Sequence, residues 1–194
     1  MAEPALRIAI VGAESTGKTA LAQALAQRIG ALSGLRSTWV REHLRAWCDA
    51  HGRTPRPDEQ AAIAAQQQAL IDSAAATHAV VVCDTTPLMT AVYSEWLFSD
   101  LSLQAEAVAQ QRRCHITLLT ALDIVWQADG LQRDGPQVRA PVDQRVRQLL
   151  VQNALPWALV TGQGNARVEC ALRAVAPLLH QRADADRKKP AAAP

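Results

Sequence analysis

The sequence contains no apolar run that approaches the roughly 18 residues needed to cross a membrane, so we expect no membrane-spanning helix. The start of the chain, Met1-Ala2-Glu3-Pro4, lacks the basic residues and the apolar stretch of a secretion signal. An excess of charge of one sign is also missing, since 20 basic and 18 acidic residues leave a net charge of +2. That balance is too even for a dedicated nucleic-acid-binding protein. We therefore expect a cytoplasmic protein with no nucleic-acid or membrane partner.

Cysteine is scarce, and its spacing excludes the common metal and redox motifs. The four cysteines, Cys48, Cys83, Cys114 and Cys170, are spread along the chain without a Cys-x-x-Cys pair, and no histidine stands at the spacing of a zinc site. We expect these residues to be buried free thiols of a protein in a reducing compartment.

Lysine is rarer still, because only three of the 20 basic residues are lysines and the other 17 are arginines. Lys188 and Lys189 belong to the last residues of the chain. Lys18 is therefore the one lysine of residues 1–187, and the residues around it carry most of the functional argument.

The hydrophobic residues, 49% of the total, form short apolar runs that alternate with segments of helical spacing. Strands are predicted at 6–11, 37–40, 79–83, 115–120 and 157–161, and helices at 18–29, 44–50, 57–77, 87–97, 101–112, 141–153 and 165–180. This alternation predicts an α/β fold, a three-layer sandwich with a parallel five-stranded sheet. We expect a single domain over residues 1–183 and a disordered tail over 184–194.

The segment Gly12-Ala-Glu-Ser-Thr-Gly-Lys-Thr19 matches the phosphate-loop pattern G-x-x-x-x-G-K-[ST] without a mismatch. The glycines let the backbone curl so that its N–H groups face a phosphate, and the helix that follows adds its positive end. The pattern also lies between a predicted buried strand and a predicted helix, as it must. We therefore predict a P-loop NTPase that binds ATP through Gly12, Ala13, Glu14, Ser15, Thr16, Gly17, Lys18, Thr19 and Ala20.

A magnesium site is predicted beside this loop. The Thr19 hydroxyl stands at the position that ligates Mg²⁺ in phosphate loops. Asp84 ends the third predicted strand, where a second acidic group would meet the ion or a water bound to it. The alternative role for Asp84 is to cap the helix that begins at Pro87.

Several classes of phosphate-loop protein are excluded by missing motifs. The guanine-specific Asn-Lys-x-Asp motif cannot occur, because no lysine lies between Lys18 and Lys188. The Leu-Ser-Gly-Gly-Gln motif of transporter ATPases is absent, and 194 residues leave little room for the helical lid domain of hexameric motors. A small-molecule kinase of the nucleoside or nucleotide type remains.

Such a kinase needs arginines in a lid that neutralises the moving phosphoryl group. The polar, glycine-containing stretch over 123–139 is the predicted lid, and Arg133 and Arg139 are its predicted catalytic arginines, with Arg145 and Arg147 on the next helix. A solvated charged loop is the alternative interpretation.

The acceptor side is predicted at the end of the second strand. Glu42 follows that strand, where a carboxylate can take the proton of an acceptor hydroxyl or hold a ribose. A surface ion pair is the alternative for Glu42. Together with Asp84, the residues predicted to contact the substrate are Arg41 and the two tryptophans Trp39 and Trp126, which could stack on a flat cationic ring.

Taken together, the motifs resemble the ribosylnicotinamide kinase domain of NadR-type proteins and their small NadR-like ATPase relatives. The resemblance rests on the phosphate loop, Arg41-Glu42, Asp84-Thr85 and Trp126-x-x-Asp129-Gly130-Leu131, and it extends over residues 6–180. It implies transfer of the ATP γ-phosphate to the ribose 5′-hydroxyl of nicotinamide riboside. Many relatives have Asp-Gly-Leu-Arg at this point. This chain has Gln132 at the position of that arginine, and its own arginine, Arg133, follows one position later. Only about five residues precede the first strand, so we expect no adenylyltransferase domain.

Two other functions stay open at this point, and the oligomeric state is not predicted. A nucleotide kinase acting on a monophosphate would need further arginines on the acceptor side, which Arg36, Arg41, Arg45 and Arg53 could supply. A non-catalytic switch would use ATP to order the lid for a partner, and it would have no need of a carboxylate at Glu42.

Overall fold

The structure is a computed structural model that describes residues 3–128 and 135–187, the last three by their backbone alone. The described residues form a five-stranded sheet with the order β2-β3-β1-β4-β5, in which all neighbouring strands are parallel. The strands are β1 (Leu6–Val11), β2 (Ser37–Val40), β3 (Val80–Asp84), β4 (Ile116–Thr120) and β5 (Trp157–Val160). The predicted α/β fold with five parallel strands is confirmed.

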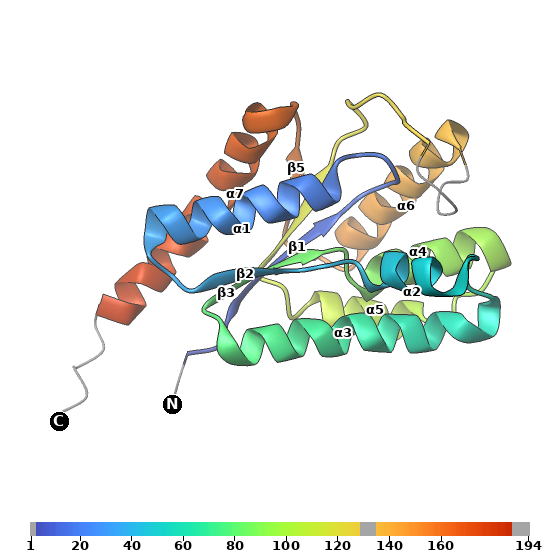
Figure 1. Ribbon diagram of the computed structural model, residues 1–194, viewed down its shortest axis with the longest axis horizontal. Helices are drawn as coiled ribbons and strands as arrows, with labels where there is room; N and C mark the ends of the chain where they lie inside the picture. Colours follow the sequence, from blue (N-terminus) through green and yellow to red (C-terminus); the bar gives the residue numbers. More distant parts are fainter. Residues whose placement is uncertain (1–2, 129–134, 188–194) are drawn as a thin grey trace.

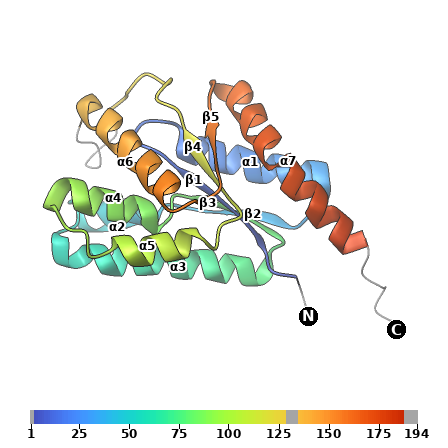
Figure 2. The ribbon, with the colours of Figure 1, turned by 180° about the vertical axis from the view of Figure 1, so that it is seen from behind.

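Helices cover both faces of the sheet (Figure 1). One face carries α1 (Lys18–Ser33) and α7 (Gly164–Arg187), and Figure 2 shows the same pair from behind. The other face carries α3 (Gln60–Thr77), α4 (Pro87–Phe98), α5 (Gln104–Gln111) and α6 (Arg139–Gln152). The short helix α2 (His43–His51) follows β2, and 3₁₀ turns η1 (Pro57–Glu59) and η3 (Pro136–Val138) precede α3 and α6.

The core consists of two large apolar clusters and a smaller one, divided by the sheet. Ile8 and Ile10 of β1 face α1 and α7, and both side chains are fully buried there. Val11 faces the other way, into the cluster of α4, α5 and α6. Because the central strands are buried on both faces, their sequences are almost continuously apolar instead of alternating. This is why short apolar runs sufficed to predict them.

Some element boundaries differ from the predicted ones. The first helix continues to Ser33 and ends at Gly34, whose φ of 68° is easily adopted only by glycine. The predicted helix over 57–77 is divided into a 3₁₀ turn and α3. Helix α7 continues through Arg187, past the predicted domain end at 183, and residues 188–194 lie outside the described residues.

Three of the four cysteines match the expectation of buried free thiols, and Cys170 does not. All four cysteines are free thiols; three are buried and Cys170 is partly exposed. Burial raises the pKa of Cys114 to about 12. No helix within residues 3–128 and 135–187 combines the length and the apolar composition required to cross a bilayer.

The phosphate loop leaves β1 at Gly12, where the chain passes very close to β4. Gly12 has a φ of 147°, and a Cβ atom there would lie 2.2 Å from Thr120 Oγ1. That oxygen forms a hydrogen bond with Thr16 Oγ1 at 2.7 Å, so it cannot move aside without loss of the contact. Glycine at this position is therefore required by space as well as by backbone conformation.

The substitution Gly12→Ala is expected to lower the free energy of unfolding by about 3 kcal/mol or more, because overpacking adds to backbone strain. Gly34→Ala is the control: Gly34 also has a positive φ, but nothing lies within 4 Å of the added methyl group. It should cost only about 1–2 kcal/mol, from the left-handed backbone alone. Urea unfolding of both variants measures the difference, and equal losses would contradict the close approach at Gly12.

Candidate active site

The phosphate loop forms a concave row of backbone groups at the carboxyl edge of the sheet. Ser15 and Gly17 have positive φ values of 54° and 75°. Left-handed residues that alternate with right-handed ones turn successive N–H groups toward one point, which makes a nest for an anion. Helix α1 begins at Lys18, directly after this nest, and adds the positive end of its dipole. The loop therefore has the backbone geometry of an anion-binding nest at a helix N-terminus.

Hydrogen bonds made by side chains fix the outer side of the loop. Thr16 Oγ1 donates to Ala13 O at 2.8 Å, and Lys18 Nζ donates to the same carbonyl oxygen at 2.8 Å. From outside the loop, the backbone N–H of Gln127 donates to Ser15 Oγ at 2.9 Å. The segment after β4 therefore lies against the loop, as the predicted lid requires.

Asp84 and Thr19 lie side by side beneath the nest. Asp84 ends β3 with a relative exposure of 1%, and Thr19 lies close enough to affect its carboxyl group. Burial raises the pKa of Asp84, while Thr19 and the charge of Lys18 act in the opposite direction. Its Oδ1 atom is buried and has no hydrogen-bond partner.

A buried carboxylate oxygen without a partner fits a cation or a water bound to one, so these residues suit Mg²⁺. Within the described parts of the chain, no cluster of three or more His, Cys, Asp or Glu side chains could hold a metal. Thr19 and Asp84 would thus hold the ion together with phosphate oxygens and water, as is usual for Mg²⁺ in phosphate-transfer sites.

Glu42 is held at the start of α2 by a glutamine from a distant helix. Gln67 of α3 is buried; its Oε1 accepts a hydrogen bond from the His43 N–H at 2.6 Å, and its Nε2 donates to Arg41 O at 3.3 Å. The two bonds bracket Glu42, so the backbone that carries the carboxylate is fixed on both sides.

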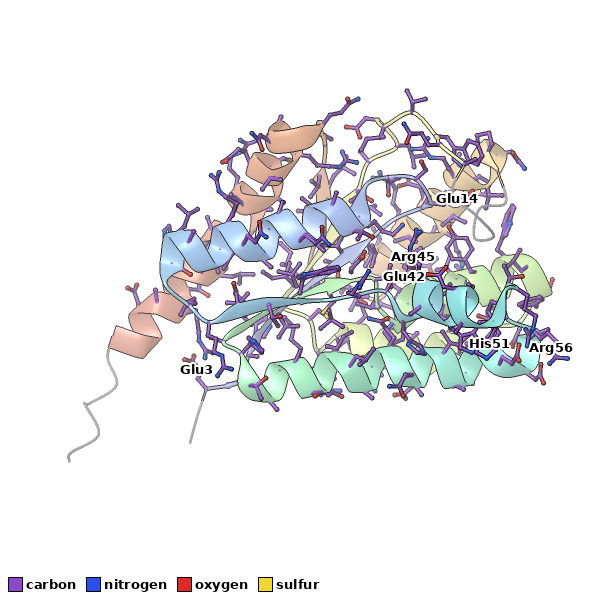
Figure 3. All side chains as sticks on the ribbon, viewed as in Figure 1. Glu3, Glu14, Glu42, Arg45, His51 and Arg56 are labelled. Atoms are coloured by element: carbon purple, nitrogen blue, oxygen red, sulfur yellow. The ribbon has the colours of Figure 1, made fainter. Side chains whose placement is uncertain are left out.

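The Glu42 carboxylate lies in a field of mixed charge. Burial raises its pKa most strongly; Lys18 and Arg45 lower it, and Asp84 raises it. The Arg45 guanidinium lies 4.0 Å from the Glu42 carboxylate. Figure 3 shows Glu14, Glu42 and Arg45 gathered between the phosphate loop and α2. A carboxylate with a raised pKa beside a lysine of the nest can accept a proton from a substrate hydroxyl.

A cavity of about 430 Å³ opens beside these groups, within the size range of small-molecule sites. Glu14, Ser15 and Lys18 form the end at the phosphate loop. The remaining walls come from α2, the segment before α3 and the second half of α4: Glu42, Leu44, Arg45, Cys48, Thr54, Pro55, Arg56, Pro57, Gln60, Tyr93, Leu97 and Phe98. The cavity is thus polar near the nest and more apolar away from it.

The Glu59 carboxylate stabilises the segment that forms the outer wall of this cavity, and its contacts with Arg53 and Arg56 are called the clasp below. Glu59 accepts hydrogen bonds from both terminal nitrogens of Arg53 at 2.7 Å and from the Arg56 N–H at 2.8 Å. The hydrogen bond from Arg53 lowers the pKa of Glu59 to about 2. Arg53 also lies over the ring of Trp47, 4.8 Å from its centre.

Residues 7–167 match the sequence model of a protein family described as an AAA domain. The chain belongs to this family. A search of curated protein sequences found no match.

Solved structures with the same fold include two of NadR protein. The structure in complex with NR has a TM-score of 0.75 and the one in complex with NAD and AMP-PNP a TM-score of 0.73, each at 18% identity over 91% of this chain. The chain spans about half the length of these proteins, 52% and 50%. Thymidylate kinase from Ehrlichia chaffeensis has a TM-score of 0.64 at 14% identity, with 91% of this chain and 100% of that one covered. The chain therefore has the P-loop kinase fold, and the expected resemblance to NadR is confirmed at the level of the fold.

The structure brings Lys18, Thr19, Glu42 and Asp84 together, as the strand ends predicted, but it distributes the other predicted substrate residues differently. Trp39 is not among the described residues that line the cavity; it packs against the core cluster beneath α1. Arg41 is exposed, with its guanidinium 5.7 Å from the centre of the Trp39 ring. Trp126 lies next to Gln127 at the phosphate loop, and its indole N–H is buried without a partner.

The predicted lid arginines also differ in placement. Arg133 lies outside the described residues. Arg139 begins α6 with 8% exposure, and its Nε and Nη2 atoms are buried without hydrogen-bond partners, so it stays a candidate for phosphate contact. Arg145 pairs with Glu95 at 2.7 Å and Arg147 pairs with Asp143 of its own helix at 2.7 Å, so both already have carboxylate partners.

Two residues that line the cavity were not predicted from the sequence, although their rarity in the sequence could have indicated them. Tyr93 and Phe98 are the only tyrosine and the only phenylalanine in the chain, and both lie on α4 and line the cavity. Two rare aromatic residues on one helix could have indicated a place for a flat ring. Gln67 carries no such signal, because its partners, 24 and 26 residues away, become its neighbours only in the folded chain.

Glu59→Gln is expected to loosen the clasp and to speed hydrogen exchange several-fold over residues 52–59, with the sheet unchanged. Because the pKa of Glu59 is lowered to about 2, the clasp is present at neutral pH and is lost only as the pH falls toward that value. Glu169→Gln, which removes an exposed pair with Arg28 at 2.7 Å, is the control. Unchanged exchange over 52–59 in Glu59→Gln would mean that other contacts hold this wall.

Proposed function

We propose that this protein is an ATP-dependent kinase that transfers the γ-phosphoryl group to a hydroxyl of a nucleoside, with nicotinamide riboside as the acceptor. The observation that carries the proposal is the cavity that joins Lys18 of the phosphate loop to the carboxylate of Glu42. A nucleotide-binding module that only switched would not need a partly buried carboxylate and a small-molecule cavity on the acceptor side.

In the proposed reaction, the bond between the γ-phosphorus and the bridging oxygen of ATP breaks, and the acceptor oxygen forms the new bond to phosphorus. The acceptor proton passes to the Glu42 carboxylate, and ADP leaves. Lys18 and the N–H groups of the loop stabilise the negative charge that shifts toward the leaving oxygen. A magnesium ion held by Thr19 and Asp84 would neutralise phosphate charge, and Arg139 would bring a further cation from the start of α6.

The cavity lining supports a nucleoside with a cationic ring. Tyr93 and Phe98 offer aromatic surface, and Glu14 and Glu42 offer negative charge. The NadR structure in complex with NR, which shares the fold, supports nicotinamide riboside among such nucleosides. The two aromatic side chains of α4 take the role that sequence analysis gave to Trp39, while Trp126 stays a proposed contact.

A nucleoside monophosphate is the second candidate acceptor, because Arg45 and Arg56 also line the cavity. Arginine side chains bind phosphate through paired hydrogen bonds. The fold is shared with thymidylate kinase, which supports keeping this candidate.

An ADP-release assay with nicotinamide riboside, uridine and thymidine monophosphate as acceptors tests the proposal. We expect the highest kcat/KM with nicotinamide riboside, and no turnover by Lys18→Ala with any acceptor. Preference for thymidine monophosphate would favour the second candidate. ADP release that no acceptor stimulates would contradict the kinase assignment.

The pH dependence of kcat tests Glu42 as the proton acceptor. Burial raises the pKa of Glu42 above that of an ordinary glutamate. As the pH falls through this raised pKa, the carboxylate becomes protonated and can no longer accept a proton, so kcat should decrease. Glu42→Gln should lower kcat by about 10²-fold, near the lower end of general-base effects because the transition state is loose. It should also abolish the acid limb of the profile.

Asp49→Asn is the matched control for this measurement, since Asp49 is an exposed acid on the same short helix. It should keep both the rate and the acid limb of the wild-type protein. An acid limb that persists in Glu42→Gln would show that another group takes the proton.

A further inference from the structure

Arg167 is a buried arginine that sequence analysis did not single out, and it connects three loops at the carboxyl edge of the sheet. It lies on α7, has a relative exposure of 3% and donates hydrogen bonds through both terminal nitrogens. Nη1 donates to Asp123 Oδ1 at 2.8 Å and to Gly162 O at 2.5 Å. Nη2 donates to Ala121 O at 3.1 Å and to Thr16 O at 2.9 Å. The loops after β1, β4 and β5 thus share one guanidinium.

The position of this arginine runs against the usual charge pattern of helices. Helix α7 begins at Gly164, so Arg167 lies in the first turn, where the helix dipole disfavours a cation. Asp123 compensates for this charge: partial burial acts to raise its pKa, but hydrogen bonds from Arg167 and the Gly162 N–H keep that pKa below its ordinary value. A residue that goes against the charge preference of a helix terminus usually marks a functional position.

The contact with Thr16 has a direct consequence for the phosphate loop. Peptide groups are planar, and none of the described peptide bonds is cis, so the carbonyl of Thr16 and the N–H of Gly17 point in opposite directions. When Arg167 holds the Thr16 oxygen on the outer side of the loop, the Gly17 N–H must face the inner side. That side is where the left-handed residues Ser15 and Gly17 direct the nest.

We propose that Arg167 is a positioning residue for nucleotide binding: its hydrogen bond to the Thr16 carbonyl orients the Gly17 N–H toward the phosphates of the bound nucleotide. The proposal rests on the proposed function, in that the nest must bind a nucleotide. A glutamine at 167 cannot span Thr16, Ala121, Gly162 and Asp123 at once, and the Thr16 carbonyl then loses the hydrogen bond that fixes its direction. A lysine could keep one of these contacts, but it lacks the two terminal nitrogens through which the arginine makes all four.

Isothermal titration with ADP and Mg²⁺, at a temperature well below unfolding, tests the proposal. Arg167→Gln should raise the Kd for ADP about tenfold, the equivalent of roughly 1.4 kcal/mol for one weakened hydrogen bond to a charged group. Arg167→Lys should give an intermediate value. Circular dichroism checks that each variant is folded at that temperature.

Two control variants separate positioning from a purely structural role. Arg182→Gln removes another arginine of α7, which donates to the backbone oxygens of Pro4 and Glu3, and should lower Tm without changing the Kd for ADP. Asp123→Asn disturbs the same cluster but leaves Arg167 in contact with Thr16, and should change the Kd less than threefold. Arg167→Gln with a wild-type Kd, or Asp123→Asn with an equally large loss, would overturn the proposal.

The proposed function and this inference fail in different ways. If the wild-type protein binds ADP but phosphorylates no acceptor, the kinase proposal fails, and the comparison of Kd values still decides the role of Arg167. If the wild-type protein does not bind ADP, both proposals are wrong.

Discussion

The shape of the phosphate loop is determined by hydrogen bonds to the carbonyl oxygens of the loop, and the rest of the site depends on that shape. Ala13 O accepts from Thr16 and Lys18, and Thr16 O accepts from Arg167. Each occupied carbonyl turns the next N–H toward the other side of the chain. The concave side is therefore lined with donors before any ligand arrives, so little reorganisation is needed when an anion binds.

The second determining feature is a pair of carboxylates beside this row of donors, of which Asp84 is buried and Glu42 is partly buried. Asp84 ends β3, and Glu42 follows the end of the neighbouring parallel strand β2; burial raises the pKa of both. Each carboxylate is costly without a cation, and the positive charges of Lys18 and Arg45 act on both. A cation beside Asp84 and a hydroxyl beside Glu42 would relieve that cost. This arrangement of charge supports the proposed binding of a metal–nucleotide complex on one side and of a hydroxyl on the other.

The sequence predicted the parts of this site that are local in the chain. The strand, loop and helix around Lys18 follow from one motif, and Glu42 and Asp84 follow from the rule that parallel strands end at one edge. Gln67 and Arg167 could not be predicted, since they reach partners 24 and 151 residues away. Trp39 shows a different limit of prediction from sequence, namely the face of the sheet on which a side chain lies. Alternate residues of β2 face opposite sides, and Trp39 pairs with Val82, which belongs to the cluster beneath α1. Proximity to Glu42 in sequence therefore did not bring Trp39 to the cavity.

The central claim, that the loop from Gly12 to Thr19 binds the phosphates of a nucleotide through its backbone, can be tested at the backbone itself. Two-dimensional ¹H–¹⁵N NMR of the 20.9 kDa protein, titrated with ADP and Mg²⁺, reports on each N–H group separately. The account predicts that the largest shifts occur at Gly17, Lys18 and Thr19, with the Gly17 proton moving downfield as it donates to phosphate. Saturable ADP binding that leaves these three amides unmoved would contradict it.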